Sequence, residues 1–203
     1  MFLRKLGFTM IELLIVIAVL GILAVAVLAA INPIEQINRG KDTGTRSDAE
    51  QLLSAVDRYY AGRGYYPWMA DNESENLAAA WVELQGTATT TIAVGADGED
   101  MLANLSSGGT SEVKESFITR IINAEQTTPL RIFNEGSLSS DSTYICFTPK
   151  SASFREEAWK RCSDDGVARA LPGDFPPLAC PAGGTCATAA TSDLATACFI
   201  CLP

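Results

Sequence analysis

One carboxylate lies inside an otherwise uncharged, apolar stretch near the start of the chain. Glu12 comes four residues after Phe8, and residues 13–31 contain no charge. An ionised carboxylate in a membrane-length helix is costly to insert, so such a residue is usually paired and functional. Cleavage between Gly7 and Phe8 would create an amine one helical turn before Glu12, on the same helix face. The spacing therefore predicts an amine–carboxylate pair, within one chain or between two packed subunits.

Six cysteines form the second chemically distinctive set, and all of them lie toward the end of the chain. They are Cys146, Cys162, Cys180, Cys186, Cys198 and Cys201. An even number of cysteines in an exported, loop-rich region predicts disulfide bonds, because closing loops stabilises a region that buries little apolar surface. The spacing does not select one pairing. We predict a bond between Cys146 and Cys162, with the last four cysteines paired among themselves.

Two other uses of these thiols remain open. The last four cysteines could bind a structural zinc ion, although the first two of them are further apart than in most zinc knuckles. Cys198 and Cys201 have the spacing of a redox motif, but no helix follows them to lower a thiol pKa. Disulfide bonds are therefore the favoured interpretation.

The chain offers few groups for catalysis. It contains no histidine, and no glycine-rich phosphate loop precedes a predicted helix. Acidic turns at 97–100 and 163–166 could offer oxygen ligands to calcium, but neither has the pattern of a calcium-binding loop. The net charge of −9 makes long-range attraction to nucleic acid weak. We predict a protein that is not an enzyme, with no cofactor, no metal and no specific nucleic-acid partner.

The element that must position Glu12 is a helix long enough to cross a membrane. Residues 8–31 would span roughly 36 Å as a helix, against a hydrocarbon core of about 30 Å. Arg4 and Lys5 precede this stretch, so residues 1–7 are expected in the cytoplasm and the remainder outside it. A secretory signal cut near Ala30 is an alternative, but the apolar stretch is longer than the apolar region of such signals.

The stretch from Leu6 to Ala18 resembles the class III signal of type IV pilins and of the pseudopilins of type II secretion. The residues that carry the resemblance are Leu6-Gly7-Phe8-Thr9-Met10-Ile11-Glu12-Leu13-Leu14-Ile15-Val16-Ile17-Ala18. The resemblance implies cleavage after Gly7 by a prepilin peptidase and N-methylation of Phe8. It also implies that Glu12, Phe8 and Gly21 set the register between subunits as they assemble.

This family resemblance also implies a location and partners. Before assembly the protein would be a single-pass inner-membrane protein in contact with lipid. An assembly platform in that membrane would then build it into a homo-oligomeric helical filament on the cell surface, for adhesion, motility or DNA uptake. The alternatives are a type II secretion pseudopilin and a monomeric, membrane-anchored binding domain. Many family members have a proline where this chain has Ala29, and Pro33 is the expected kink here.

A second helical segment is predicted over residues 32–62. Pro33, Gly40 and Gly44 weaken its first part, so residues 32–46 are expected to be its least stable section. From Ser47 onward, apolar residues recur at spacings of three and four, which is typical of a helix with one buried face. Gly62 and Gly64 end this segment, and an aromatic cluster at 65–68 is expected to cover a small core.

Residues 63–203 are predicted to form one globular head with a cysteine-rich region at 146–203. Strands are expected at 89–94, 130–133 and 143–147, and helices at 74–84 and 112–124. The tail after Val167 is expected to form loops. The predicted fold class is α+β, with a long N-terminal helix packed on a small antiparallel sheet, as in the pilin fold.

Overall fold

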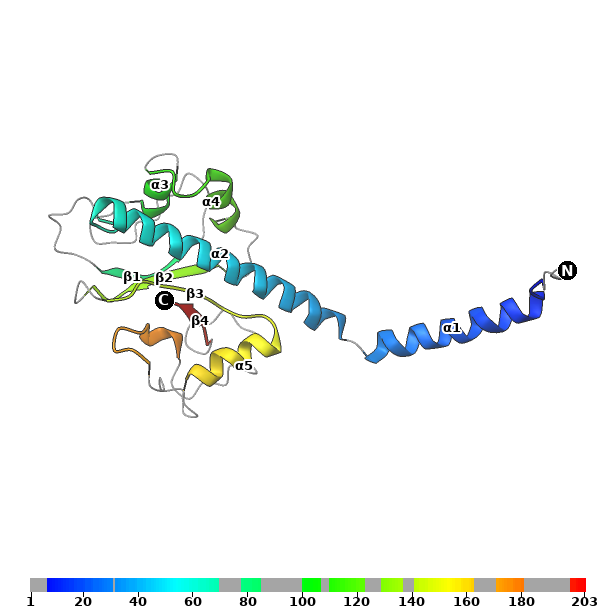
Figure 1. The fold of residues 1–203 in the computed structure, drawn as a ribbon. Coiled ribbons are helices and arrows are strands. Elements are labelled where there is room, and N and C mark those ends of the chain that lie inside the picture. Colours follow the sequence, from blue (N-terminus) through cyan, green and yellow to red (C-terminus); the bar gives the residue numbers. More distant parts are fainter. Residues whose placement is uncertain are drawn as a thin grey trace, which may run out of the picture. The chain divides into compact units, whose positions relative to one another are not determined.

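The computed structural model describes residues 7–30, 32–69, 78–84, 100–106, 110–122, 129–136, 141–162, 171–180 and 198–203. It divides into two compact units, Met1–Ile37 and Asn38–Pro203, which are considered separately. Figure 1 shows the elements of both units.

The N-terminal unit contains the apolar helix α1, Met10–Ala30. Within it, Met10–Ala29 has a mean hydropathy of 3.1 and is long enough to cross a membrane. Helix α2 then runs from Pro33 to Arg63. The side chain of Asn32 accepts a hydrogen bond from the N–H of Glu35 and caps α2. Pro33 is the first residue of α2, where its missing N–H removes no helical hydrogen bond.

Helix α2 ends where the glycines predicted it would. Gly64 follows the last helical residue, Arg63, and has a φ of +81°, a conformation that favours glycine. Its N–H donates to the carbonyl of Tyr60. The chain then turns into the predicted aromatic cluster, where the rings of Tyr66 and Trp68 stack with centroids 4.5 Å apart and are buried in the core.

The head contains one four-stranded antiparallel sheet, in the order β1-β2-β3-β4. Its strands are β1 (Ala79–Leu84), β2 (Leu130–Asn134), β3 (Tyr144–Phe147) and β4 (Ile200–Leu202). Helices α3 (Met101–Leu105) and α4 (Glu115–Ile122) lie on one side of α2 and the sheet lies on the other (Figure 1). A further helix, α5 (Ala152–Arg161), and a short 3-10 helix, η1 (Pro177–Ala179), complete the described elements. The predicted α+β class is confirmed.

Both faces of the sheet carry buried side chains. Successive side chains of a strand point to opposite faces, so each strand contributes to both clusters. Ile132, Ile145 and Ile200 belong to the larger core, together with the buried face of α2. The α2 contribution consists of Ala49, Leu52, Ala55, Val56 and Tyr59. On the other face, Tyr144 and Cys146 pack with Ala179, Phe199 and Cys201 in a second, smaller cluster. The sheet therefore has α2 on one face and the smaller cluster on the other.

Several predicted elements are confirmed and others are wrong. Strands β2 and β3 and helix α4 occur close to their predicted positions. The helix predicted at 74–84 is wrong over its described part, because Ala79–Leu84 is a strand that pairs with β2. The tail after Val167 was expected to contain only loops, but it includes β4 and η1. The strand predicted at 89–94 lies outside the described residues, and α5 was not anticipated.

The predicted cysteine pairing is wrong, although disulfide bonds themselves are confirmed. Cys146 bonds to Cys201, and Cys162 bonds to Cys180. The first bond joins register partners on β3 and β4, whose Cα atoms are 4.1 Å apart. Cys198 is also disulfide-bonded, and Cys186 lies outside the described residues. No described cysteine is a free thiol, and Cys201 is bonded to Cys146 rather than to Cys198.

Candidate assembly site at the start of α1

The predicted processing site lies in a non-helical, exposed segment immediately before α1. Gly7, Phe8 and Thr9 precede the helix, which begins at Met10, and Phe8 is 85% exposed. The first helical hydrogen bond runs from the N–H of Leu13 to the carbonyl of Thr9. The Gly7–Phe8 peptide bond therefore lies outside the helical hydrogen-bonding pattern.

Thr9 and Glu12 form a reciprocal cap at this helix start. The backbone N–H and the hydroxyl of Thr9 both donate to Oε2 of Glu12, each at 2.8 Å. In return, the N–H of Glu12 donates to the Thr9 hydroxyl at 3.3 Å. This is the capping-box arrangement, which satisfies N–H groups that the first turn of a helix leaves without partners. The motif residues therefore also fix where α1 begins.

This contact was missed in the sequence, although its pattern was visible there. A threonine followed three residues later by a glutamate is a known helix-start signal. The spacing alone predicts only an amine on Phe8 as the partner of Glu12. In the structure Glu12 accepts hydrogen bonds from Thr9.

The remainder of α1 presents apolar side chains on every side. Its large hydrophobic residues are between 47% and 91% exposed, from Val16 to Met10. Gly21 lies in the middle of this surface, and a Cβ atom added there would meet nothing within 4 Å. Among the described residues of one chain, nothing requires glycine at this position. The site thus combines an apolar surface with one carboxylate near its end.

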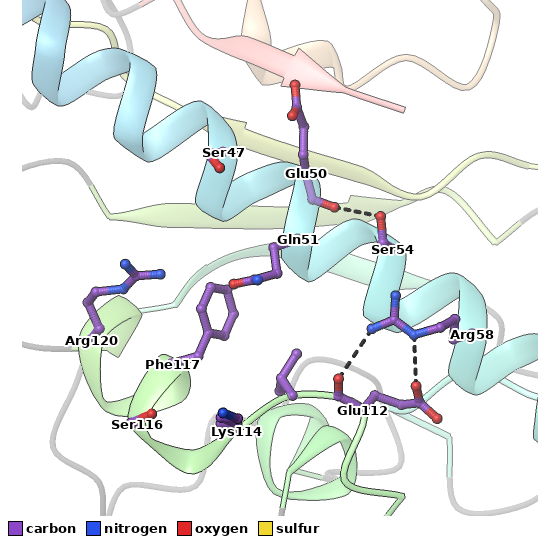
Figure 2. A pocket seen from close by; sticks show the side chains of 11 residues that line it. Ser47, Glu50, Gln51, Ser54, Arg58, Glu112, Lys114, Ser116, Phe117 and Arg120 are labelled. Atoms are coloured by element: carbon purple, nitrogen blue, oxygen red, sulfur yellow. Dashed lines mark hydrogen bonds and ion pairs between the residues drawn. The ribbon is translucent and has the colours of Figure 1, made fainter.

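A second candidate site is an open groove of about 900 Å³ between α2 and α4 (Figure 2). Arg58 pairs with Glu112 at 2.9 Å, and Arg120 pairs with Asp48 at 2.6 Å. Burial raises the pKa of Asp48, and the charge of Arg120 opposes that shift. These partly exposed ion pairs link the segment around α4 to α2. The residues that line the groove supply no thiol, imidazole or metal-ligand cluster, so we assign it no chemistry.

The predicted site residues therefore do not meet at one place. Gly7, Phe8 and Glu12 lie together at the start of α1, and Gly21 lies further along the same helix. Pro33 begins α2. The described cysteines lie in the head, where they form disulfide bonds. The N-terminal group combines an exposed apolar helix with one carboxylate at its start.

Comparisons with known proteins recognise the same N-terminal segment. A family model for the prokaryotic N-terminal methylation motif matches residues 3–28. The chain is 29% identical over 133 residues to fimbrial protein EcpC of Eikenella corrodens, which covers 66% of this chain and 78% of the relative. It is 35% identical over 108 residues to type IV major pilin protein PilE1 of Neisseria gonorrhoeae. That second match covers 53% of this chain and 62% of the relative, so the chain spans less than two thirds of the length of PilE1.

No solved structure matches the chain. Both curated relatives match over stretches longer than the N-terminal motif, so the similarity is not confined to that motif. The family resemblance seen in the first residues is confirmed. The chain therefore carries a prokaryotic N-terminal methylation motif and is similar to two fimbrial proteins, one of them a type IV major pilin.

Proposed function

We propose that this chain is a structural subunit that is cut between Gly7 and Phe8, N-methylated on Phe8 and assembled through α1 into a type IV pilus-like filament. In this role it has no enzymatic activity of its own. A prepilin peptidase would process it, and an inner-membrane assembly platform would move it from lipid into the filament. The family motif and the names of the two relatives support this proposal.

The observation that carries the proposal is that only one of the two carboxylate oxygens of Glu12 accepts the hydrogen bonds from Thr9. Both hydrogen bonds from Thr9 end on Oε2. Among the residues that the structure describes, none donates a hydrogen bond to Oε1. That oxygen can accept the Phe8 amine of a neighbouring subunit while the helix cap stays intact. An amine and a carboxylate paired in an apolar core are far less costly than either charge alone.

The apolar surface of α1 supplies the rest of the interface. Lipid tails are as apolar as leucine, so burying this surface between helices gains little by the hydrophobic effect alone. Close packing and polar pairs drive the association of helices in lipid. We therefore infer that Glu12 determines which helices pair and that Gly21 lets a neighbouring helix approach closely. Within the described part of one chain, a Cβ atom at Gly21 would meet nothing within 4 Å.

Mass spectrometry of the N-terminal peptide tests the proposed processing. The protein would be isolated from native cells in both a membrane fraction and a sheared surface fraction. A chain that begins at methylated Phe8 and is abundant in the sheared fraction supports a filament pilin. The same terminus found only in membranes favours a pseudopilin. An intact Met1 would make α1 a plain anchor, and a terminus near Ile31 would make the protein a simple secreted one.

Substitution of Glu12 tests the proposed pairing. Glu12→Gln retains a carbonyl oxygen that can accept the Thr9 hydrogen bonds but removes the charge, whereas Glu12→Ala and Glu12→Lys remove both. All three variants are expected to insert and to be cleaved, and to lose sheared filaments by at least about tenfold. Glu156→Gln in the head, which removes an exposed pair with Lys160, is the matched control. Filaments at wild-type levels in Glu12→Ala would refute the pairing.

A further inference from the structure

A buried carboxylate joins α2 to the start of α5. Asp42 is 1% exposed and accepts hydrogen bonds from two consecutive backbone N–H groups, those of Lys150 and Ser151. It also accepts the hydroxyl hydrogen bond of Ser151 at 2.6 Å. Ser151 is in turn the N-cap of α5, where N–H groups of the first turn favour a negative charge. We call this arrangement the Asp42–Ser151 contact.

The next turn of α2 reinforces this contact. Both guanidinium nitrogens at the end of Arg46 donate to the carboxylate of Glu157 on α5, at 3.0 and 3.2 Å. At the other end of α5, Arg161 donates to the carbonyl of Cys201 at 2.7 Å, and Cys162 is disulfide-bonded to Cys180. Helix α5 is therefore fixed to α2 at one end and to the disulfide-bonded region at the other.

The part of α2 before Asp42 has a different environment. None of residues 33–41 is buried. Residues 43–48 are not buried either, but they lie between Asp42 and Ala49, each at most 1% exposed, and include Arg46, which pairs with α5. Gly40 lies in the exposed part before Asp42, and a glycine inside a helix lowers its stability because it has more conformational freedom to lose. Amides in helices with few buried contacts open locally at low free-energy cost.

We propose that the Asp42–Ser151 contact sets the point at which α2 can unwind. Residues 33–41 open and close while the head stays folded. Residues 42–63 open only when α5 separates from α2 or when the head unfolds. The exposed part of α2 can then unwind over a variable number of residues. The Asp42–Ser151 contact, rather than a helix-breaking residue, sets how far along α2 the unwinding extends.

Hydrogen exchange measured by mass spectrometry on the full chain in mild detergent tests this proposal. In the wild-type protein, amides of residues 37–41 are expected to exchange fast and those of 43–60 slowly. Asp42→Asn removes the charge but keeps the side-chain size, and is expected to speed exchange of residues 43–48 by about tenfold or more. Exchange in β2 and β3 is expected to stay unchanged.

Asp48→Asn is the matched control, because Asp48 lies on the same helix and pairs with Arg120 of α4 rather than with α5. It is expected to leave exchange of residues 43–48 as in the wild type. Ser151→Ala, which removes one hydroxyl donor, is a milder second variant in case Asp42→Asn unfolds the head. Equal protection of 37–41 and 43–48 in the wild type would overturn the proposal. So would wild-type exchange of residues 43–48 in both Ser151→Ala and a folded Asp42→Asn.

Discussion

The two described disulfide bonds close loops of different length, which leads to a quantitative prediction. The bond between Cys146 and Cys201 spans 55 residues, and the bond between Cys162 and Cys180 spans 18. We compare two double variants, each of which replaces both cysteines of one bond with alanine. The pair on β3 and β4 is expected to be the more costly to remove.

The magnitude follows from the entropy of the unfolded chain. In the loop-closure account, the longer loop contributes about 4 kcal/mol of stability and the shorter one about 3 kcal/mol at 25 °C. The shorter loop lies within the longer one, but the dependence on length is logarithmic, so this changes the first value only slightly. Cys146 and Cys201 are also fully buried, and alanine there loses sulfur contacts in the smaller core. The expected difference between the two variants is therefore about 1 to 2 kcal/mol.

Urea unfolding of the full chain in mild detergent measures this difference. Trp68 is fully buried, so its fluorescence is expected to report unfolding of the head. A domain of this size loses about 2 to 4 °C in melting temperature per kcal/mol, so thermal scans give a second reading. Mass spectrometry of peptides from the unreduced wild-type protein checks that Cys146 is linked to Cys201.

Two results would refute the reasoning. A peptide that links Cys146 to Cys162 would restore the pairing expected from the sequence and remove the loop lengths used here. Equal destabilisation by the two double variants, with the pairing confirmed, would show that neither loop length nor burial of the sulfur atoms determines the stability.

Two further predictions concern charged groups of the head. Glu83→Gln is expected to lower the free energy of unfolding by about 1 to 3 kcal/mol, because it leaves the buried Arg131 without its counter-ion. Adding Arg131→Met is expected to recover much of that loss, as measured by urea unfolding. A double variant no more stable than the single one would contradict this. The N–H of Ser142 donates to Asp174 and lowers the pKa of its carboxyl in the folded protein. The resulting stability is present at neutral pH and is lost as the pH falls through that folded-state pKa. The difference in unfolding free energy between wild type and Asp174→Asn is therefore expected to shrink between neutrality and about pH 3. A difference independent of pH would contradict this.

The parts of the fold that were predictable are those determined by local patterns. The apolar stretch of α1 and the glycine after Arg63 are both signals carried by consecutive residues, and both were interpreted correctly. The β-branched and aromatic residues of β2 and β3 gave the same local signal.

Strand β1 shows where local preference fails. Its alanines favour a helix, but Val82 pairs with Ile132 and Glu83 pairs with Arg131 across the sheet. Those contacts come from residues about fifty positions away, and they outweigh intrinsic preference. The same limit explains the disulfide error, because Cys146 and Cys201 become neighbours only after β3 pairs with β4.

The candidate site was predicted in composition but not in geometry. Glu12 was correctly singled out as an unusual charge, yet its contact with Thr9 follows from where the helix begins. Asp42 gave no signal at all, because a single aspartate in a weak helical section looks like an ordinary surface residue. Its role depends on Ser151, more than a hundred residues later in the chain.

The burial of β3 on both faces has a consequence for how related chains can vary. Tyr144 and Cys146 belong to the smaller core, while Ile145 and Phe147 belong to the larger one. An insertion or deletion of one residue in the β2–β3 hairpin, if the strand moved with it, would exchange these two sets between the faces. Cys146 would then face α2 and lose its bonding partner. Related chains that keep this disulfide are therefore expected to vary in length elsewhere in the head. They are expected to keep the same β3 side chains on the same face of the sheet.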